Sequence, residues 1–169
     1  PWIGQAPFTK TEHIFANMGD GTYFHSGLMA IRAAVAAKVS MTYKILYNDA
    51  TAMTGGQHVD GELSPQQITF QLHSEGIREI YLVSENPHLY PASDIAPGVK
   101  VAHRDELDAV QKTCRTVKGA SAIVFVQTCA AEKRIISAKR TDDGRAFDEL
   151  MARHAGALND SMKPFSQGL

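Results

Sequence analysis

The sequence predicts an α/β protein of three layers, in which a mainly parallel β-sheet has helices on both faces. One observation is that short apolar runs alternate with segments of helical period, the order expected of parallel strands joined by crossover helices. A second is the run 122–126, which is apolar throughout, as in a strand buried on both faces. A length of 169 residues with 44% hydrophobic composition allows one such domain with a packed core.

The first part of the chain supplies two strands with a helix between them. His13–Met18 is a short, mostly apolar run that ends on Gly-Asp-Gly, which indicates a strand entering a tight turn. The Ala-rich segment 26–38 spaces its bulky apolar residues near a helical period, and Ser26 is a suitable N-cap. The apolar run Met41–Tyr47 predicts the second strand.

The middle of the chain continues the alternation. Segment 51–61 is polar and Gly-rich without a period, and so is expected to be a loop. Ser64-Pro65 combines an N-cap residue with Pro at the first helical position, and Gly76 ends the helix that starts there. Glu79–Ser84 is the third strand, and the three prolines of 86–98 predict another loop.

The last third holds two more strands and one amphipathic helix. A short strand is expected over 99–102, a helix over 105–117 and an apolar strand over 122–128. Beyond residue 131 the composition becomes highly charged. We therefore expect a main domain over 1–131 and, over 132–169, a charged linker with an accessory helix at 145–158.

Composition excludes several classes of function. The net charge of −1 provides no field that would attract nucleic acid or a membrane surface, and no apolar run approaches the ~20 residues of a membrane span. The two cysteines, Cys114 and Cys129, are too few for a structural zinc site or an iron–sulfur cluster. We expect reduced thiols in a cytoplasmic protein, with Cys114 in the core. The start at Pro1 is expected to lie inside a longer chain.

Polar residues with the chemistry of a metal site follow the first two strands. Asp20 and Asn48 each come directly after a predicted strand, so both should lie at the carboxyl edge of the sheet, where ligands bind in parallel α/β folds. A carboxylate oxygen of Asp20, the amide oxygen of Asn48 and the carbonyl of Ala50 are oxygen ligands of the kind that Mg²⁺ prefers. The sequence therefore predicts a divalent cation at this edge.

Glycines and a helix start near these residues indicate that the cation is paired with a diphosphate. Gly19 and Gly21 would allow a sharp turn and a close approach to an anion, and a helix beginning near Ser26 would direct free N–H groups at it. A second flexible turn is available in Thr54, Gly55 and Gly56, followed by Gln57. His25 either touches substrate or caps the helix, and His13 is expected on the surface or in a loop.

At these residues the sequence resembles the thiamine diphosphate-binding domain of 2-oxoacid:ferredoxin oxidoreductases, in particular the indolepyruvate branch in its long fused form. The similarity covers about residues 1–134. It is carried by four stretches, PWIGQAPF, FANMGDGTYFHSGLMAIRAAVAAKV, TYKILYNDATAMTGGQHVDG and ASAIVFVQTCAAEKR. The resemblance implies the pyrophosphate-type domain of this fold, without its N-terminal part.

The resemblance also implies roles for residues. Asp20, Asn48 and the Ala50 carbonyl would bind Mg²⁺, while Gly21, Thr22 and the turn 54–57 would contact the diphosphate. It implies an enzyme that decarboxylates an aryl or branched 2-oxoacid, passes electrons through iron–sulfur clusters to ferredoxin and transfers the acyl group to coenzyme A. Those clusters are expected elsewhere in the full protein.

The resemblance implies partners as well. Thiamine diphosphate enzymes activate the cofactor with a Glu from a separate pyrimidine-binding domain, which this sequence lacks. The remaining domains of the same chain, or a partner subunit, would supply it, and a homo-oligomer is expected. The fragment alone should be inactive. Two alternatives remain open: a non-oxidative decarboxylase or acetolactate synthase type of enzyme, and a non-catalytic α/β binding module.

Overall fold

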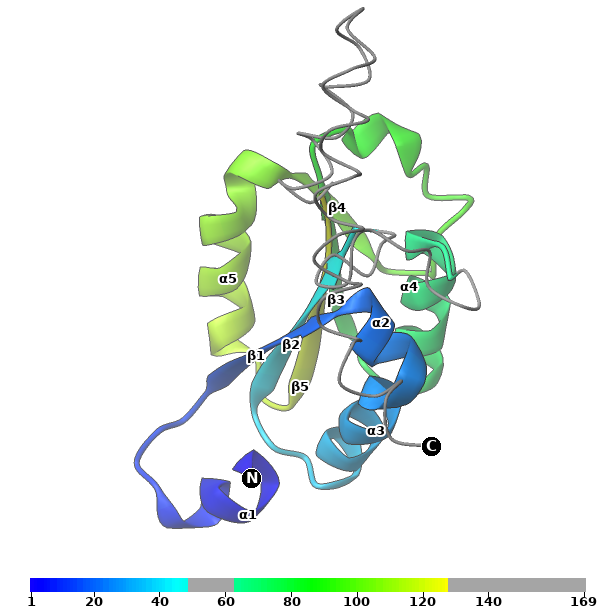
Figure 1. Cartoon of the computed structure of the whole chain (residues 1–169). Coiled ribbons are helices and arrows are strands. Elements are labelled where there is room, and N and C mark those ends of the chain that lie inside the picture. Colours follow the sequence, from blue (N-terminus) through cyan, green and yellow to red (C-terminus); the bar gives the residue numbers. More distant parts are fainter. Residues whose placement is uncertain (49–62, 128–169) are drawn as a thin grey trace, which may run out of the picture. The chain divides into compact units, whose positions relative to one another are not determined.

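A computed structural model describes residues 1–48 and 63–127 of the chain, and it confirms the predicted α/β fold (Figure 1). A single sheet of five parallel strands has the order β1-β2-β5-β3-β4. Its strands are β1 (Ile14–Gly19), β2 (Met41–Tyr47), β3 (Glu79–Ser84), β4 (Lys100–His103) and β5 (Ala120–Val126). All five lie within about two residues of the runs that the sequence predicted.

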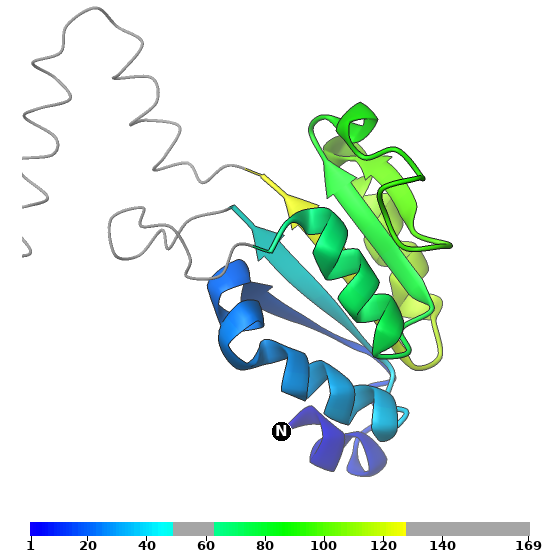
Figure 2. The same cartoon turned by 90° about the vertical axis from the view of Figure 1, so that its right-hand side faces the viewer.

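Helices cover both faces of the sheet, as the alternating sequence pattern predicted. α3 (Leu28–Ala36) and α4 (Pro65–Ser74) pack on one face, and α5 (Leu107–Thr116) packs on the other (Figures 1 and 2). Short helical pieces complete the chain, namely α1 (Trp2–Gln5), η1 (Ala6–Phe8), α2 (Asp20–Thr22), η2 (Tyr23–Gly27), η4 (Pro87–Leu89) and η5 (Arg104–Glu106).

The central strand is β5, the last in sequence among the described strands. It pairs with β2 on one side and β3 on the other. The connection from β2 to β3 therefore skips one strand position in the sheet, and β5 later occupies that position. A strand in the middle of a parallel sheet is covered on both faces, and residues 121–124 of β5 are buried in succession. The apolar run identified in the sequence is therefore the centre of the fold.

The first long helix begins earlier than the sequence indicated. The prediction that Ser26 caps a helix over 26–38 is wrong, because α2, the π-helical turn η2 and α3 follow one another without a break from Asp20 to Ala36. The N-cap is Gly19, the last residue of β1. A capping residue must precede the first turn, and Ser26 lies inside the run. The positive end of the helix dipole is thus at the end of β1.

The other helix boundaries follow the predicted signals more closely. Ser64 caps α4 through a complete capping box with Gln67, and Pro65 is its first residue. The helix expected over 105–117 begins with the 3-10 turn η5, which His103 caps, and continues as α5. Gly76 has φ +96°, the left-handed conformation that follows the end of α4. α5 ends differently, on the extended Val117, and Gly119 with φ +102° lies in the turn before β5.

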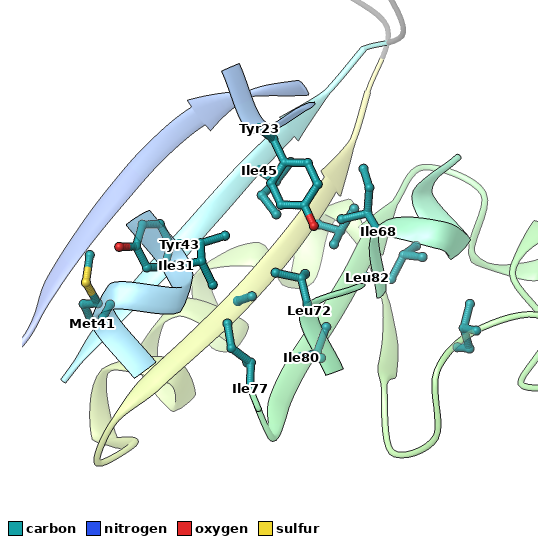
Figure 3. Packing of buried hydrophobic residues seen from close by; sticks show 14 residues of the cluster. Tyr23, Ile31, Met41, Tyr43, Ile45, Ile68, Leu72, Ile77, Ile80 and Leu82 are labelled. Carbon is teal, nitrogen blue, oxygen red and sulfur yellow. The ribbon is translucent and has the colours of Figure 1, made fainter. Parts of the chain in front are cut away.

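Two apolar clusters fill the spaces between the layers. The larger lies between the sheet and the pair α3 and α4, where Ile31, Ile45 and Leu72 have no exposed surface (Figure 3). The smaller lies under α5 and includes Ile123 and Cys114. Cys114 is fully buried, which confirms its predicted place in the core, and burial raises the pKa of its thiol.

Some expectations concern residues outside the described ranges. The loop 51–61, the accessory helix 145–158 and the boundary at residue 131 stay predictions. Within residues 1–48 and 63–127, no helix is long and apolar enough to span a membrane.

Candidate functional site

The structure brings Asp20 and Asn48 together at the carboxyl edge of the sheet, as their positions after two strands predicted. β1 and β2 are parallel neighbours, with Gly19 paired to Leu46. The Asp20 carboxylate spans the two strand ends. One oxygen, Oδ1, accepts a hydrogen bond from the Gly21 N–H at 2.8 Å, and the other, Oδ2, accepts one from the Asn48 N–H at 2.9 Å. The carboxylate therefore holds the backbone of the second strand end in place.

Asp20 is a charged residue in a buried position. Only 9% of its surface is exposed, and acidic side chains at this depth are rare unless hydrogen bonds or a cation compensate them. The two backbone N–H groups supply part of that compensation. A carboxylate oxygen can accept more than one interaction, so a hydrogen-bonded carboxylate can also be a cation ligand.

The start of the helical run adds positive potential at the same place. Because the run begins at Asp20, the N–H groups of its first turn lie beside the end of β1. Anions are stabilised at such an end, since the N–H groups and the helix dipole both point toward them. The sequence placed this anion site at Ser26; the structure places the helix start six residues earlier, directly beside the predicted metal ligand.

The sequence predicted two roles for Gly19 and Gly21, a sharp turn and a close approach to an anion. Gly19 has φ −72° and ψ 160°, an extended conformation open to any residue, and neither glycine has a positive φ. The prediction of a sharp glycine turn is therefore wrong. A Cβ at either position would meet no atom of residues 1–48 and 63–127 within 4 Å. As far as these residues go, the two glycines leave space beside Asp20, which fits a close approach of ligand to backbone.

The donor set fits a hard cation whose coordination is completed by a ligand. Among the described residues, no group of three or more His, Cys, Asp or Glu side chains could hold a metal ion. The Asp20 carboxylate, together with amide, carbonyl, phosphate or water oxygens, would give the usual environment of Mg²⁺. The predicted ligand Ala50 and the predicted diphosphate contacts Thr54, Gly55, Gly56 and Gln57 lie outside the described residues.

The remaining predicted residues of the site lie on the helical run. Thr22 is exposed in the first turn, and His25 is exposed in η2. Capping of a helix start by His25 is wrong, because the helix begins at Asp20; contact with substrate stays a prediction. Sequence reasoning missed Tyr23, which is buried and bonded to α4 beside the site. The sequence feature that could have identified it is an aromatic residue directly after the first helical turn.

The buried Asp20 carboxylate joins two strand ends at the start of a helical run, and it lies at the sheet edge where parallel α/β folds bind their ligands. The sequence of residues 3–125 matches the model of the family described as thiamine pyrophosphate enzyme, C-terminal TPP binding domain. The match covers well over half of the chain, and the protein belongs to this family. Thiamine pyrophosphate is another name for thiamine diphosphate.

Solved structures with a similar fold include enzymes of this cofactor class. A proposed thiamin diphosphate-dependent enzyme from Mycobacterium smegmatis has 20% identity and a TM-score of 0.52, with 75% of this chain and 20% of that chain covered. Benzoylformate decarboxylase from Polynucleobacter necessarius has 18% identity and a TM-score of 0.53, with 75% and 22% covered. At these identities the likeness shows the fold alone.

A third similar structure is a 2-oxoglutarate:ferredoxin oxidoreductase from Magnetococcus marinus, with 15% identity, a TM-score of 0.49, and 66% of this chain and 38% of that chain covered. That likeness is too distant to support a choice of reaction. The chain spans about a fifth of the length of the first two structures. No curated protein matches the sequence.

Proposed function

We propose that this chain binds Mg²⁺ and the diphosphate of thiamine diphosphate at the carboxyl edge of β1 and β2. Asp20, Asn48 and the Ala50 carbonyl are the proposed metal ligands. The observation that supports this most directly is the Asp20 carboxylate, buried and shared between the Gly21 and Asn48 N–H groups. The proposed diphosphate contacts are Gly21, Thr22, Thr54, Gly55, Gly56 and Gln57.

The residues of this chain have a binding and orienting role in the proposal. Asp20 fixes the separation of the two strand ends and offers its oxygens to the cation. The first turn of the helical run presents N–H groups and a positive dipole end to the diphosphate. Thiamine diphosphate supplies the chemistry of breaking a carbon–carbon bond beside a carbonyl, and the protein supplies its position and electrostatic environment.

The proposed reaction is oxidative decarboxylation of an aryl or branched 2-oxoacid, of the indolepyruvate type. The bond between the keto carbon and the carboxylate breaks, carbon dioxide leaves, and a bond forms between the acyl carbon and the sulfur of coenzyme A. One proton and a pair of electrons are released, and the electrons pass through iron–sulfur clusters to ferredoxin. The stretches around Gly-Asp-Gly and Thr-Gly-Gly-Gln support this branch of the family.

The proposal requires partners. A pyrimidine-binding domain with its Glu would come from the same longer chain or from another subunit, and the iron–sulfur clusters, ferredoxin and coenzyme A would act with the full protein. A cytoplasmic homo-oligomer fits this arrangement by analogy with other thiamine diphosphate enzymes. Residues 132–169 would form the charged linker and accessory helix.

Calorimetric titration of the complete protein with thiamine diphosphate, in the presence of Mg²⁺, tests the binding site. Wild type should release heat and saturate, and Asp20→Asn should bind on the order of 100-fold more weakly, because a carboxylate ligand is lost. Asp108→Asn is the matched control, since Asp108 is an exposed carboxylate on α5. Equal affinity in Asp20→Asn and wild type would reject the site.

A second experiment separates the reactions. The complete protein should contain iron and should reduce a viologen dye when given indolepyruvate and coenzyme A. Carbon dioxide release without dye reduction or iron would identify a non-oxidative decarboxylase or acetolactate synthase type of enzyme instead. A non-catalytic binding module would show neither activity, and Asn48→Ala would then leave every function of the complex unchanged.

A further inference from the structure

The proposed cofactor site depends on the position of one short turn. Asp20 belongs to α2, which has three residues, and the π-helical turn η2 follows it directly. π turns are rare within helices and occur often at functional sites. The buried residues of this segment are Asp20, Tyr23 and Gly27, so Tyr23 has its only large buried side chain.

Tyr23 connects this segment to a neighbouring helix. Its ring is 1% exposed and lies among the apolar side chains between the sheet and α4, close to Ile45 and Ile68 (Figure 3). Its hydroxyl donates a hydrogen bond to Oε1 of Gln71 at 2.9 Å. Burial and the nearby Glu75 raise the pKa of Tyr23, which keeps the hydroxyl protonated as a donor.

The acceptor is on a well-fixed element. α4 begins with a complete capping box at Ser64, and its residues Ile68 and Leu72 are buried in the main cluster. Thr69 also connects α4 to the loop between β3 and β4, since its Oγ1 accepts a hydrogen bond from the Ala96 N–H at 3.0 Å. Gln71 therefore gives Tyr23 a fixed point outside the helical run.

We propose that the Tyr23–Gln71 hydrogen bond sets the position of the turn that carries Asp20, and that Tyr23 is a positioning residue of the Mg²⁺–thiamine diphosphate site. The inference rests on the proposed function. Tyr23 lies three residues after Asp20, about one helical turn away. Binding sites lose affinity when a ligand group moves by about half an ångström, so a loosened turn weakens binding even though Tyr23 touches no cofactor.

A second buried tyrosine, Tyr43 of β2, provides a matched control because it bonds to the same helical run from outside. The Tyr43 hydroxyl donates a hydrogen bond to the Ala30 carbonyl at 3.0 Å, and Tyr43 is 5% exposed. Both tyrosines therefore attach the run to its surroundings through one buried hydroxyl. Ala30 is ten residues after Asp20, whereas Tyr23 is beside it. Loss of either hydroxyl removes one hydrogen bond, and only one of them is next to the site.

The test measures cofactor affinity and thermal stability in Tyr23→Phe, Gln71→Leu, the double variant and Tyr43→Phe of the complete protein. Calorimetry with thiamine diphosphate and saturating Mg²⁺ should give a Kd about threefold to tenfold higher in Tyr23→Phe, because cofactor binding must then order the loosened turn; the net worth of one neutral hydrogen bond sets the upper limit. Gln71→Leu should show a similar rise and the double variant no further one, since both changes remove the same bond. Tyr43→Phe should lower the melting temperature of the apoprotein similarly, with Kd changed less than about twofold.

Each outcome decides the inference. An unchanged Kd in Tyr23→Phe, an equal rise in Tyr43→Phe, or additive effects in the double variant would show that Tyr23 only stabilises the fold. Tight binding in wild type together with any of these results leaves the proposed function intact. A wild-type protein that does not bind Mg²⁺ and thiamine diphosphate overturns the proposed function and this inference together.

Discussion

Strands β1 and β2 have a buried polar cluster at each of their two ends. The cluster at the carboxyl ends is charged, and the cluster at the amino ends is neutral. At their carboxyl ends lies the Asp20 carboxylate, bonded to the backbone of Gly21 and Asn48. At their amino ends, on the α5 face, Nε2 of His13 lies 2.8 Å from Oγ1 of Thr42, and this hydroxyl lies 2.8 Å from Oγ of Ser121. Thr42 and Ser121 have no exposed surface.

The difference between the two clusters is in how their polar groups are satisfied. In the amino-end cluster, neutral side chains bond to one another across β2 and β5, in register with the pairing of Thr42 and Ser121. The carboxyl-end cluster has a charge at its centre, open space beside its glycines and a helix start that favours an anion. Burial of polar groups is therefore common to both ends, and only the charged, open cluster has the chemistry of a binding site.

Thr42→Val should produce the largest change in stability. The substitution keeps the side-chain shape and removes the hydroxyl that joins His13 to Ser121, leaving the buried Ser121 hydroxyl with one fewer partner. The free energy of unfolding should fall by about 1–3 kcal/mol, and urea denaturation measures it. Affinity for Mg²⁺ and thiamine diphosphate should stay within about twofold of wild type, because the site is at the other end of the strand.

Thr113→Val is the control for that experiment. Thr113 is exposed on α5, and its hydroxyl donates a hydrogen bond to the Ala109 carbonyl at 3.1 Å. Its replacement should change stability by less than about 0.5 kcal/mol. If Thr42→Val instead weakened cofactor binding tenfold at unchanged stability, the two clusters would not be independent and the comparison would fail.

Gly21→Ala and Gly27→Ala should change the stability of the apoprotein less than Thr42→Val does, and in opposite directions. A Cβ at Gly21 meets no atom of the described part of the chain within 4 Å, so Ala should stabilise the helix of the apoprotein by up to about 1 kcal/mol. The same Cβ occupies the space beside Asp20, and thiamine diphosphate should bind about tenfold more weakly, a loss of about 1.4 kcal/mol. Thermal denaturation of the apoprotein and calorimetry of cofactor binding measure the two effects.

Gly27 provides the contrast within the same helical run. A Cβ there would lie 2.7 Å from Sδ of Met18 and 3.1 Å from the Thr22 carbonyl oxygen. Gly27→Ala should therefore destabilise the apoprotein by about 1 kcal/mol, less if the flexible Met18 side chain moves aside. A Gly21→Ala protein that is destabilised and binds cofactor normally would show that Gly21 serves packing and not ligand binding.

The sequence was sufficient for the strands and for the two residues at the site centre. Apolar runs and their order define a parallel sheet, and residues after consecutive strands must meet at one edge of it, so Asp20 and Asn48 could be placed together. The start of the helical run was missed because Asp20 and Gly21 resemble a turn, and Ser26 is a common capping residue. The helix start is set by Gly19, whose extended backbone directly precedes the first helical residue. The sequence does not reveal that conformation.

Contacts between distant residues could not be predicted. His13 lies in the loop before β1, as expected, but its bond to Thr42 joins residues 29 apart and depends on the register of two strands. The bond between Tyr23 and Gln71 likewise depends on how α4 lies against the sheet. Propensity and spacing describe one element at a time, whereas these bonds arise where several elements pack together.

The smallest expected effect is a pH dependence that belongs to the amino-end cluster alone. Nδ1 of His13 is buried and has no hydrogen-bond partner among residues 1–48 and 63–127, so a proton there would lack an acceptor. Burial lowers the pKa of His13 below 6.5, and the positive charges of Arg115 and Lys118 lower it further. His13 is therefore neutral in the folded protein at neutral pH, and Nε2 can share a proton with Thr42.

The sign of the effect follows from the direction of this shift. A histidine whose pKa is lower in the folded state stabilises the protein above the unfolded pKa of 6.5, and that contribution is lost as the pH falls through the folded value. The free energy of unfolding of wild type, from urea denaturation, should thus fall more between neutral pH and about pH 5 than that of His13→Gln, which cannot gain a charge. The ratio of the cofactor Kd of wild type to that of His13→Gln should stay constant over this pH range.

Equal pH dependence of stability in the two proteins would show that His13 is protonated as easily in the fold as in the unfolded chain. A ratio that changed with pH would couple the amino-end cluster to the site, against the independence of the two ends.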